Sequence, residues 1–433
     1  MKYFFLFFMF TGSFVSDVLS QSPYLPFNRD YYSLLERYEI KNGAFNEFFH
    51  TGSKPYRRDE VVQFLEKYKQ TAGYLSSKDE FNLNYLLQDN WEYASDTMAL
   101  SKLSLGKHIY NRPSDFYGYK NKDFDVHLNP VLYLQGGAEI DSDQMPFRNT
   151  RGLAIHGSID NKIGFYTMLA TTDLLFPSWV NDYVGSHGAI PGQGFWKRYG
   201  DRGYSFFSAR GHITFSATGH VNIQMGHDSH FIGEGLRSFI LSDFSNPFVF
   251  VKVNTKIGKV NFTNLWGQMT ADIITSRGVP TDGRYPQKWF SFHRLGVNLG
   301  KRFNLGVFES VMADKANWNY FNPLIFYRWV EHQLGTPDKV MLGTDMKWNL
   351  GKGMQLYGQF VLDEFVFDEF FHITESGSSR NKHGVQLGYK YIDVAGIDNL
   401  DFQLEYNQAR PFTFQEKFVL YQLQHSTYPP KRS

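Results

Sequence analysis

The chain has 433 residues, of which 42% are hydrophobic and 18% aromatic, and its 44 Lys and Arg against 43 Asp and Glu give a formal net charge of +1. This balance excludes the strong basic field of a typical nucleic-acid-binding protein, and the absence of Cys excludes disulfides, thiolate catalysis and Cys-based zinc sites. The mature sequence has no apolar run of the ~20 residues that a membrane helix needs, so it would have to cross a membrane as strands.

The first residues have the pattern of an export signal. Lys2 precedes an apolar stretch from Tyr3 to Phe10, and Val18 and Ser20 occupy the small-residue positions of a cleavage site. We therefore expect residues 1–20 to be a signal peptide. The alternative is a buried first helix or strand, which the lack of a polar face disfavours for a surface helix.

The segment after the signal peptide has a helical and polar pattern. Asp30, Asp59 and Ser77 each come before or at the start of a run of apolar residues with helical spacing, and Glu80 stands at capping-box distance from Ser77. The three runs are Tyr31, Leu34, Leu35 and Tyr38; Val62, Leu65 and Tyr68; and Phe81, Leu83 and Leu86. This pattern predicts a small helical domain over residues 21–122.

From about His127 onward the apolar residues alternate with polar ones, which is the period of a β-strand. The alternating segments include Val221 to Met225, Leu342 to Leu350, Val385 to Tyr391 and Leu400 to Asn407. One face of each strand is expected to meet lipid and the other to meet water. In the last segment we expect Phe402 and Leu404 to face lipid, and Asp401, Gln403 and Glu405 to face the interior.

Short and long connections alternate between these strands. The short turns are expected at Asp160-Asn161, Ala217 to Gly219, Ile257-Gly258, Gly300 to Arg302, Gly351-Lys352 and Val394 to Asp398, and the long loops at Gly136 to Thr150, Thr172 to Tyr204, Asp228 to Pro247, Thr270 to Lys288, Ala313 to Asp338 and Phe365 to Asn381. This alternation favours an up-and-down antiparallel transmembrane β-barrel in the outer membrane over a soluble sandwich.

The barrel is expected to occupy residues 123–433, with roughly thirteen strands. A long loop follows the first strand, which places the helical domain on the periplasmic side. Bacterial single-chain barrels usually have an even number of strands, and the last residues, His425 to Ser433, include Pro429, Pro430, Lys431 and Arg432. We therefore expect the barrel to be C-terminally truncated.

Several segments in one order resemble a known family. They are DYYSLLERYEIKNG (30–43), FNLNYLLQDN (81–90), GHDSHFIGEGLRSFILSDFSNPF (226–248), FNPLIFYRWVEHQLGTPDKVMLGTD (321–345), YGQFVLDEF (357–365) and YIDVAGIDNLDFQLEYNQARPFTF (391–414). With these the chain resembles the Wzi-type capsule-assembly proteins, in the subgroup that includes RemB-type gliding-motility proteins.

The resemblance implies an eighteen-stranded barrel with periplasmic helices that acts as a surface lectin. The implied partners are capsular or surface polysaccharide, outer-membrane lipid and the barrel-assembly machinery, and no nucleic acid. A role in attaching or assembling surface polysaccharide is the first interpretation, a part in gliding motility or adhesion is the second, and a transport channel is the third.

Catalytic patterns are weak in this sequence. His227, Asp228 and His230 suggest a metal site or a His-Asp hydrolase pair, but a polar network of Asp228, Arg237 and Asp243 that stabilises a folded-in loop is the simpler interpretation. The pairs Asp363-Glu364 and Asp368-Glu369 suggest glycoside hydrolysis, although charge clusters at a strand end are more common. No nucleophile elbow, zincin or phosphate-loop motif is present. We therefore expect no enzymatic activity, no cofactor and no metal.

Aromatic and basic residues in two long loops are the candidates for sugar binding, since rings stack on sugar faces and guanidinium groups bind hydroxyls or carboxylates. The candidates are Trp179, Trp196, Arg198, Arg202, Trp318, Tyr320 and Asn322. The alternative for each of them is a place in the aromatic girdle or in loop packing.

Overall fold

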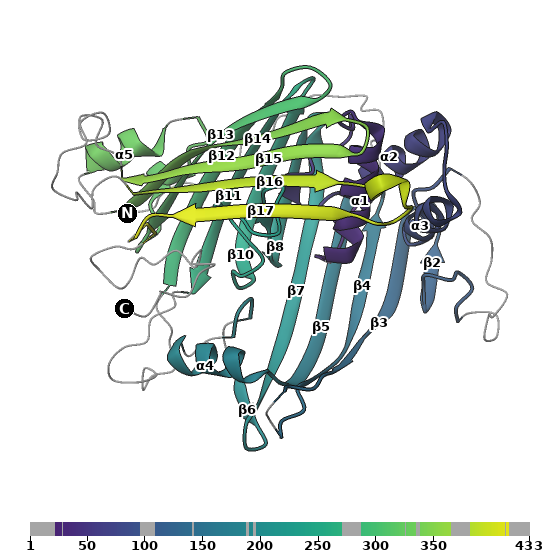
Figure 1. The fold of residues 1–433 in the computed structure, drawn as a ribbon, viewed down its shortest axis with the longest axis horizontal. Coiled ribbons are helices and arrows are strands. Elements are labelled where there is room, and N and C mark those ends of the chain that lie inside the picture. Colours follow the sequence, from purple (N-terminus) through teal and green to yellow (C-terminus); the bar gives the residue numbers. More distant parts are fainter. Residues whose placement is uncertain are drawn as a thin grey trace, which may run out of the picture.

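The structure is a computed structural model that describes residues 22–27, 29–95, 109–140, 143–187, 190–193, 196–270, 287–324, 326–334, 338–364, 382–411 and 413–414. A large curved sheet wraps around a small group of helices (Figure 1). The expected signal peptide at residues 1–20 and the last residues from 415 lie outside the described part.

Three helices form the domain expected over residues 21–122. They are α1 (Arg29–Asn42), α2 (Arg58–Thr71) and α3 (Ser77–Gln88). Their apolar faces pack into one core that includes Leu35, Tyr38, Val62, Leu65, Leu83 and Leu86, as the spacing predicts. Phe81 is 72% exposed, so it does not belong to this core. Within the described residues, no helix is long and apolar enough to span a membrane.

The helix starts differ slightly from the expected ones. The capping box is formed by Ser76 and Asp79, one residue before the predicted pair: the Ser76 hydroxyl accepts the amide of Asp79 at 3.1 Å, and the Asp79 carboxylate accepts the amide of Ser76 at 3.2 Å. Asp30 and Asp59 lie inside the first turns of α1 and α2 and cap neither helix. An acidic side chain in the first turn still interacts favourably with the helix dipole.

The sheet is antiparallel, and its described strands follow one another in chain order except that β6 pairs beside β7. Its strands are β2 (Tyr117–Lys120), β3 (Phe124–Gly136), β4 (Phe147–Ile159), β5 (Ile163–Leu175), β6 (Lys197–Tyr199), β7 (Gly203–Thr218), β8 (Val221–Asp228), β10 (Phe248–Ile257), β11 (Val260–Thr270), β12 (Gln287–Asn298), β13 (Phe303–Ala313), β14 (Lys339–Gly351), β15 (Met354–Glu364), β16 (Lys382–Tyr391) and β17 (Phe402–Ala409). Apart from the short β2 and β6, these are the thirteen expected strands. β2 already lies within the residues assigned to the helical domain.

The smaller elements belong to the connections. They are β1 (Ser53–Lys54), β9 (Phe231–Ile232), α4 (Ser178–His187), η1 (Trp318–Phe321), α5 (Tyr327–Leu334) and η2 (Val394–Gly396). Among the described residues the strands are joined as predicted: the strand ends that flank the long connections lie at one end of the sheet, the long-loop rim, and the short turns lie at the other, the short-turn rim. The connections over 271–286 and 365–381 lie outside the described residues. At the β4–β5 turn, Asp160 and Asn161 have φ of 51° and 49°, a conformation that Asp and Asn tolerate better than most residues.

The two faces of the last strand are as the alternation predicts. Phe402 and Leu404 are 49% and 62% exposed on the outer surface. On the inner surface Gln403 donates to the Tyr357 hydroxyl at 2.8 Å, and that hydroxyl donates to Glu405 at 2.8 Å. An apolar exterior, an inward-facing polar row and alternating connections form the architecture of an outer-membrane β-barrel.

The concave interior of the sheet, the lumen, differs from the expected water-facing surface. On strands β10 to β15, toward the long-loop rim, the inward side chains form an apolar cluster with the loop that follows β8. Phe290 and Phe292 of β12 are 1% and 0% exposed there, and Phe239 and Leu241 of the loop are equally buried. The simple rule of a polar inner face fails here because a loop, and not water, fills this part of the lumen.

Candidate functional site

The helical domain is attached to the inner wall through ion pairs near the short-turn rim. The Lys347 ammonium of β14 donates to the Glu39 carboxylate of α1 at 2.7 Å, and Lys390 of β16 donates to Glu36 at 2.6 Å. Arg37 of α1 pairs with Asp393 and with Asp401 at the β16–β17 turn. The helices therefore sit inside the curve of the sheet (Figure 1).

These ion pairs are buried, so their charges depend on each other. Burial alone would raise the pKa of Glu36, but the cations Lys390 and Lys54 hold the pKa of this carboxyl at about 2. Glu36 therefore stays ionised at any physiological pH. Removing one partner of such a pair leaves an uncompensated buried charge, which is strongly destabilising.

The loop after β8 closes the lumen from the other side. Its strand β9 pairs with β1 of the helical domain, and the amide of Phe239 donates to Gln359 on β15 at 2.9 Å. The amide of Leu236 donates to Glu405 at 2.8 Å, and Gln386 of β16 donates to the carbonyl of Arg237 at 3.0 Å. The helical domain and this loop, which contact each other through β1 and β9, together form a plug attached to the inner face of β14 to β17.

The polar residues predicted in this loop, Asp228, Arg237 and Asp243, differ in burial. Asp228 is buried at the end of β8, where it lies 3.3 Å from the His212 ring and accepts the amide of Ser229 at 2.8 Å. The Arg237 side chain is exposed and Asp243 is half-buried. The segment does fold inward, and it bonds to the wall through its backbone groups and through the wall side chains of Gln359, Gln386 and Glu405.

The suggested His-Asp site is not assembled. His227 and Asp228 are neighbours on β8, so their side chains point to opposite faces of the sheet. On the outer side, Nδ1 of His227 lies 2.9 Å from the carbonyl oxygen of Ala209. The buried His230 ring packs edge-on against the Phe250 ring, with the ring centroids 4.2 Å apart. The three side chains therefore do not share one site.

The carboxylate pairs suggested for glycoside hydrolysis do not form a catalytic site among the described residues. Asp363 lies 3.0 Å from the Lys339 ammonium and accepts the amide of Phe414 at 2.7 Å. It is thus part of the interior packing. Asp368 and Glu369 lie outside the described residues.

The first group of predicted sugar contacts lies on the loop between β5 and β7. Trp179 of α4 is 72% exposed, and Arg198 and Arg202 in and after β6 are exposed. Trp196 is half-buried, and its ring packs edge-on against that of Tyr204 with the centroids 4.7 Å apart. Both rings belong to a cluster with Leu174 and Phe206. Trp196 therefore supports the loop, while the other three side chains face outward from it.

The second group lies on the loop between β13 and β14, which folds back over the outer wall. Tyr320 is 2% exposed and donates to Asp338 at 2.7 Å, and its carbonyl accepts from Trp266 at 3.0 Å. Asn322 follows η1 and is half-buried, and Trp318 is 88% exposed. The prediction that Tyr320 stacks on a sugar is wrong in this arrangement, since its ring is inside the packing of the loop.

This second loop covers polar groups on the outer wall. The Glu309 carboxylate accepts the amides of Tyr327 and Arg328 at 2.6 and 2.7 Å, at the first turn of α5, and lies 3.2 Å from the His293 ring. The loop covers these polar groups and presents its own exposed rings, Phe326 and Trp329, so the surface at this place is apolar. Trp318 and its neighbours therefore match the aromatic girdle better than a sugar site. In Figure 1, α4 and α5 lie far apart, so the two groups are not brought together.

The attachment residues of the plug were missed at the sequence level. Lys347 and Lys390 are recognisable as polar residues of alternating strands, and Glu36 and Glu39 as carboxylates three residues apart on one helix. The sequence features that could have indicated the attachment are the basic residues at inner positions of the strands and the acidic residues along one face of the helix. Nothing in the sequence pairs them, because the partners are more than three hundred residues apart.

Comparisons with known proteins add little to this description. No known family profile and no curated protein matches the chain. Among solved structures, Pseudomonas aeruginosa OccK3 (OpdO) is similar with 9% identity and a TM-score of 0.33 over 67% of this chain and 72% of that one. Pseudomonas aeruginosa OccK9 (OpdG) has 12% identity and a TM-score of 0.32 over 66% and 82%, and Salmonella typhi OmpF in complex with daunomycin has 8% and 0.29 over 67% and 92%. At these TM-scores the likeness carries no argument about function.

Proposed function

We propose that this protein resides in the outer membrane as a plugged barrel and attaches an acidic polysaccharide at the cell surface through the loop between β5 and β7. The observation that carries the proposal is the outward display of one indole ring and two guanidinium groups, Trp179, Arg198 and Arg202, on a loop with its own packed base. This agrees with the resemblance to capsule-assembly proteins.

The chemistry of the loop fits an anionic sugar polymer. Rings stack on the apolar faces of pyranoses, and guanidinium groups bind carboxylates with paired hydrogen bonds. Lys197 and Tyr199 add a further cation and an exposed ring to the same short strand, β6. Each contact is weak, and many copies of the protein holding one long polymer would make the attachment stable through avidity.

The base of the loop supports this role. Leu174, Val184, Ile190 and Phe206 form a buried cluster beneath the exposed residues, with Trp196 and Tyr204 packed against it. A rigid base reduces the entropy that binding would otherwise cost. Replacing the exposed residues should therefore remove binding without unfolding the barrel.

The test is a triple variant, Trp179→Ala, Arg198→Ala and Arg202→Ala, in cells that make the full-length protein. We expect capsule to be released into the medium, with bound capsule per cell falling at least about tenfold, since avidity multiplies the loss of each contact. The amount of protein in the outer-membrane fraction should stay the same, because changes in exposed loops rarely unfold a scaffold.

The matched control is Lys259→Ala, Arg302→Ala and Lys352→Ala, which removes three exposed cations from the short-turn rim. This control should retain capsule normally. If the first triple variant also retains capsule but loses spreading motility, the motility or adhesion function replaces the proposed one. If neither property changes, this loop is not the binding site.

A further inference from the structure

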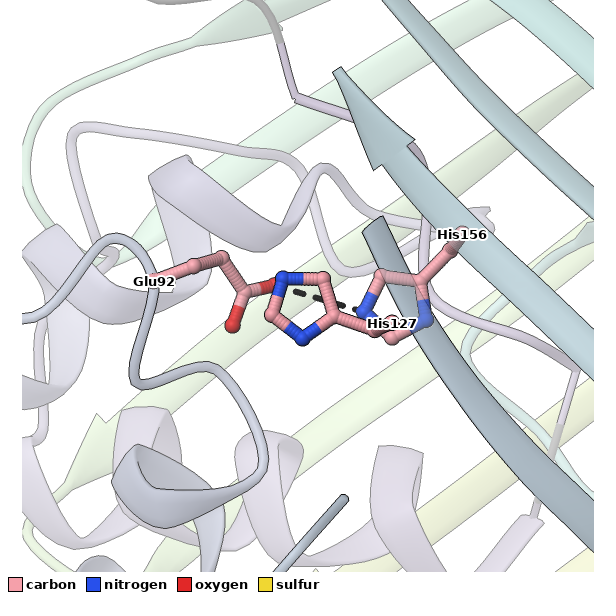
Figure 2. A group of neighbouring side chains, drawn as sticks. All are labelled: Glu92, His127 and His156. Carbon is pink, nitrogen blue, oxygen red and sulfur yellow. Dashed lines mark ion pairs between the residues drawn. The ribbon is translucent and has the colours of Figure 1, made fainter. Parts of the chain in front are cut away.

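A buried cluster of histidine and carboxylate side chains joins the helical domain to the first strands of the wall. His127 of β3 and His156 of β4 are direct cross-strand partners on the inner face. Glu92 reaches them from the turn that follows α3, so the cluster connects two parts of the fold (Figure 2). None of the attachment contacts described above uses these residues.

The geometry of the cluster brings ligand-type atoms together. One ligand atom from each of Glu92, His127 and His156 lies within 4.8 Å of the others. The two imidazole rings are stacked, with centroids 4.6 Å apart and planes 7° from parallel, and the Glu92 carboxylate lies 3.5 Å from Nε2 of His156. Asp125, two residues before His127 on β3, brings its Oδ2 to 3.3 Å from Nε2 of His127.

These atoms are buried without hydrogen bonds. Both carboxylate oxygens of Glu92, Nε2 of His127, Nε2 of His156 and Oδ2 of Asp125 have no hydrogen-bond partner. Glu92, His156 and Asp125 are each 6% exposed, and His127 is 0% exposed. Buried polar atoms are normally hydrogen-bonded, and five neighbouring atoms that make no hydrogen bond point to a bound group that would satisfy them.

The surroundings orient one of the histidines as a metal ligand is usually oriented. Nδ1 of His127 lies 2.8 Å from Oδ2 of Asp115, and the same oxygen accepts from the Trp91 indole at 2.6 Å. Asn129 donates to the other oxygen of Asp115 at 3.1 Å. A carboxylate that holds the far nitrogen of a ligating histidine is the common outer-shell partner at metal sites.

The charges also favour a cation. Three buried carboxylates, those of Glu92, Asp115 and Asp125, lie in or beside the cluster. The Arg58 guanidinium lies 3.8 Å from Glu92 and 3.7 Å from the half-buried Asp89, and the exposed Lys120 ammonium donates to the Glu92 carbonyl at 2.6 Å. With neutral imidazoles this leaves an excess of buried negative charge. A divalent cation would offset it.

We propose that Glu92, His127 and His156 bind one Zn²⁺ ion, with Asp125 beside His127. Two imidazole nitrogens and one carboxylate oxygen are a ligand set that zinc accepts. The ion fastens the end of the helical domain to β3 and β4. It does so at the side of the lumen opposite the Lys347 and Lys390 ion pairs.

The test measures metal in the full-length protein, purified in detergent from outer membranes with a tag that contains no histidine. After exposure to ZnSO₄ and removal of loosely held metal, elemental analysis should find about one zinc per chain. Exposure to Co²⁺ instead should give the visible absorption of an imidazole-bound Co²⁺ ion. Chelation should lower the melting temperature of the wild-type protein, and zinc should restore it.

The variants His156→Ala and Glu92→Gln should lower zinc affinity by at least about tenfold. The matched control is His212→Ala, which removes another buried histidine that lies beside a carboxylate on the same inner face, 3.3 Å from Asp228. It should keep the full zinc content. If the ligand variants fail to fold, the metal content and Co²⁺ spectrum of the wild-type protein still decide the question.

Two results would overturn the proposal. The first is a folded wild-type protein with less than about a tenth of a zinc per chain and a melting temperature that neither zinc nor a chelator changes. In that case protonated histidines balance the carboxylates. The second is a wild-type zinc content that stays unchanged in both ligand variants, which would place the metal elsewhere on the chain.

Discussion

Replacing Lys347 by Met should lower the free energy of unfolding by about 3–5 kcal/mol and loosen the plug from the wall. The Lys347 ammonium is 2.7 Å from Glu39 and 3.4 Å from Glu234, and its side chain is 3% exposed. Without it, two carboxylates, one from α1 and one from the loop after β8, would face each other in a buried space. The measurement is thermal unfolding in detergent, combined with the rate of proteolysis within the helical domain.

Two further variants make this result specific. Adding Glu39→Gln to Lys347→Met should recover part of the loss, because it removes one of the uncompensated charges. Lys352→Met, at the exposed turn of the same β14–β15 hairpin, should change stability by no more than about 0.5 kcal/mol. An unchanged melting temperature in Lys347→Met would mean that this ion pair does not attach the plug.

Replacing Leu404 by Arg should impair assembly in the outer membrane, because a cation on the lipid-facing wall costs up to about 2–4 kcal/mol, depending on its depth. Leu404 is the third of the 8 residues of β17 and is 62% exposed on the outer surface. The measurement is the amount of folded protein in the outer-membrane fraction, read from its heat-dependent electrophoretic mobility.

The neighbouring residue supplies the control for this experiment. Gln403 faces the lumen between Asp401 and Glu405 on the same face of β17, so an Arg at this position meets two carboxylates. Gln403→Arg should therefore assemble far better than Leu404→Arg. Equal yields of the two variants would contradict the assignment of the faces.

The local features of the fold could be predicted from the sequence. Alternation on β17 correctly places Phe402 outside and Glu405 inside, and the turn at Asp160-Asn161 lies where those residues predict it. Such features depend on residues a few positions apart. The helical spacing of the apolar residues up to Tyr38 and Leu65 correctly predicts the buried faces of α1 and α2, because it too depends only on nearby residues.

Features that depend on distant segments could not be predicted. Tyr320 looks like a residue of an exposed loop, yet it is buried because that loop folds back over Trp266 on the outer wall. Glu92 and His127 come from segments with different periodicity, and the sequence of neither segment indicates that the two residues lie close together. The expected absence of a metal rested on missing sequence motifs, and a site assembled from a turn and two strands has no such motif.

The state of the lumen separates a surface-attachment protein from a channel. In the described structure the helical domain and the loop after β8 occupy the interior, with ion pairs at one end and an apolar cluster at the other. An apolar, side-chain-filled passage does not conduct ions as a water-filled one does. A surface-attachment protein is therefore expected to have a closed interior, and a channel an open one.

The most direct test is the single-channel conductance of the wild-type, full-length protein reconstituted in a planar lipid bilayer. We expect correct insertion with almost no steady current, and an increase in current when Lys347→Met loosens the plug. A large and stable conductance of the wild-type protein, comparable with that of a water-filled barrel of similar strand number, would contradict the plugged interior and would make transport the better interpretation.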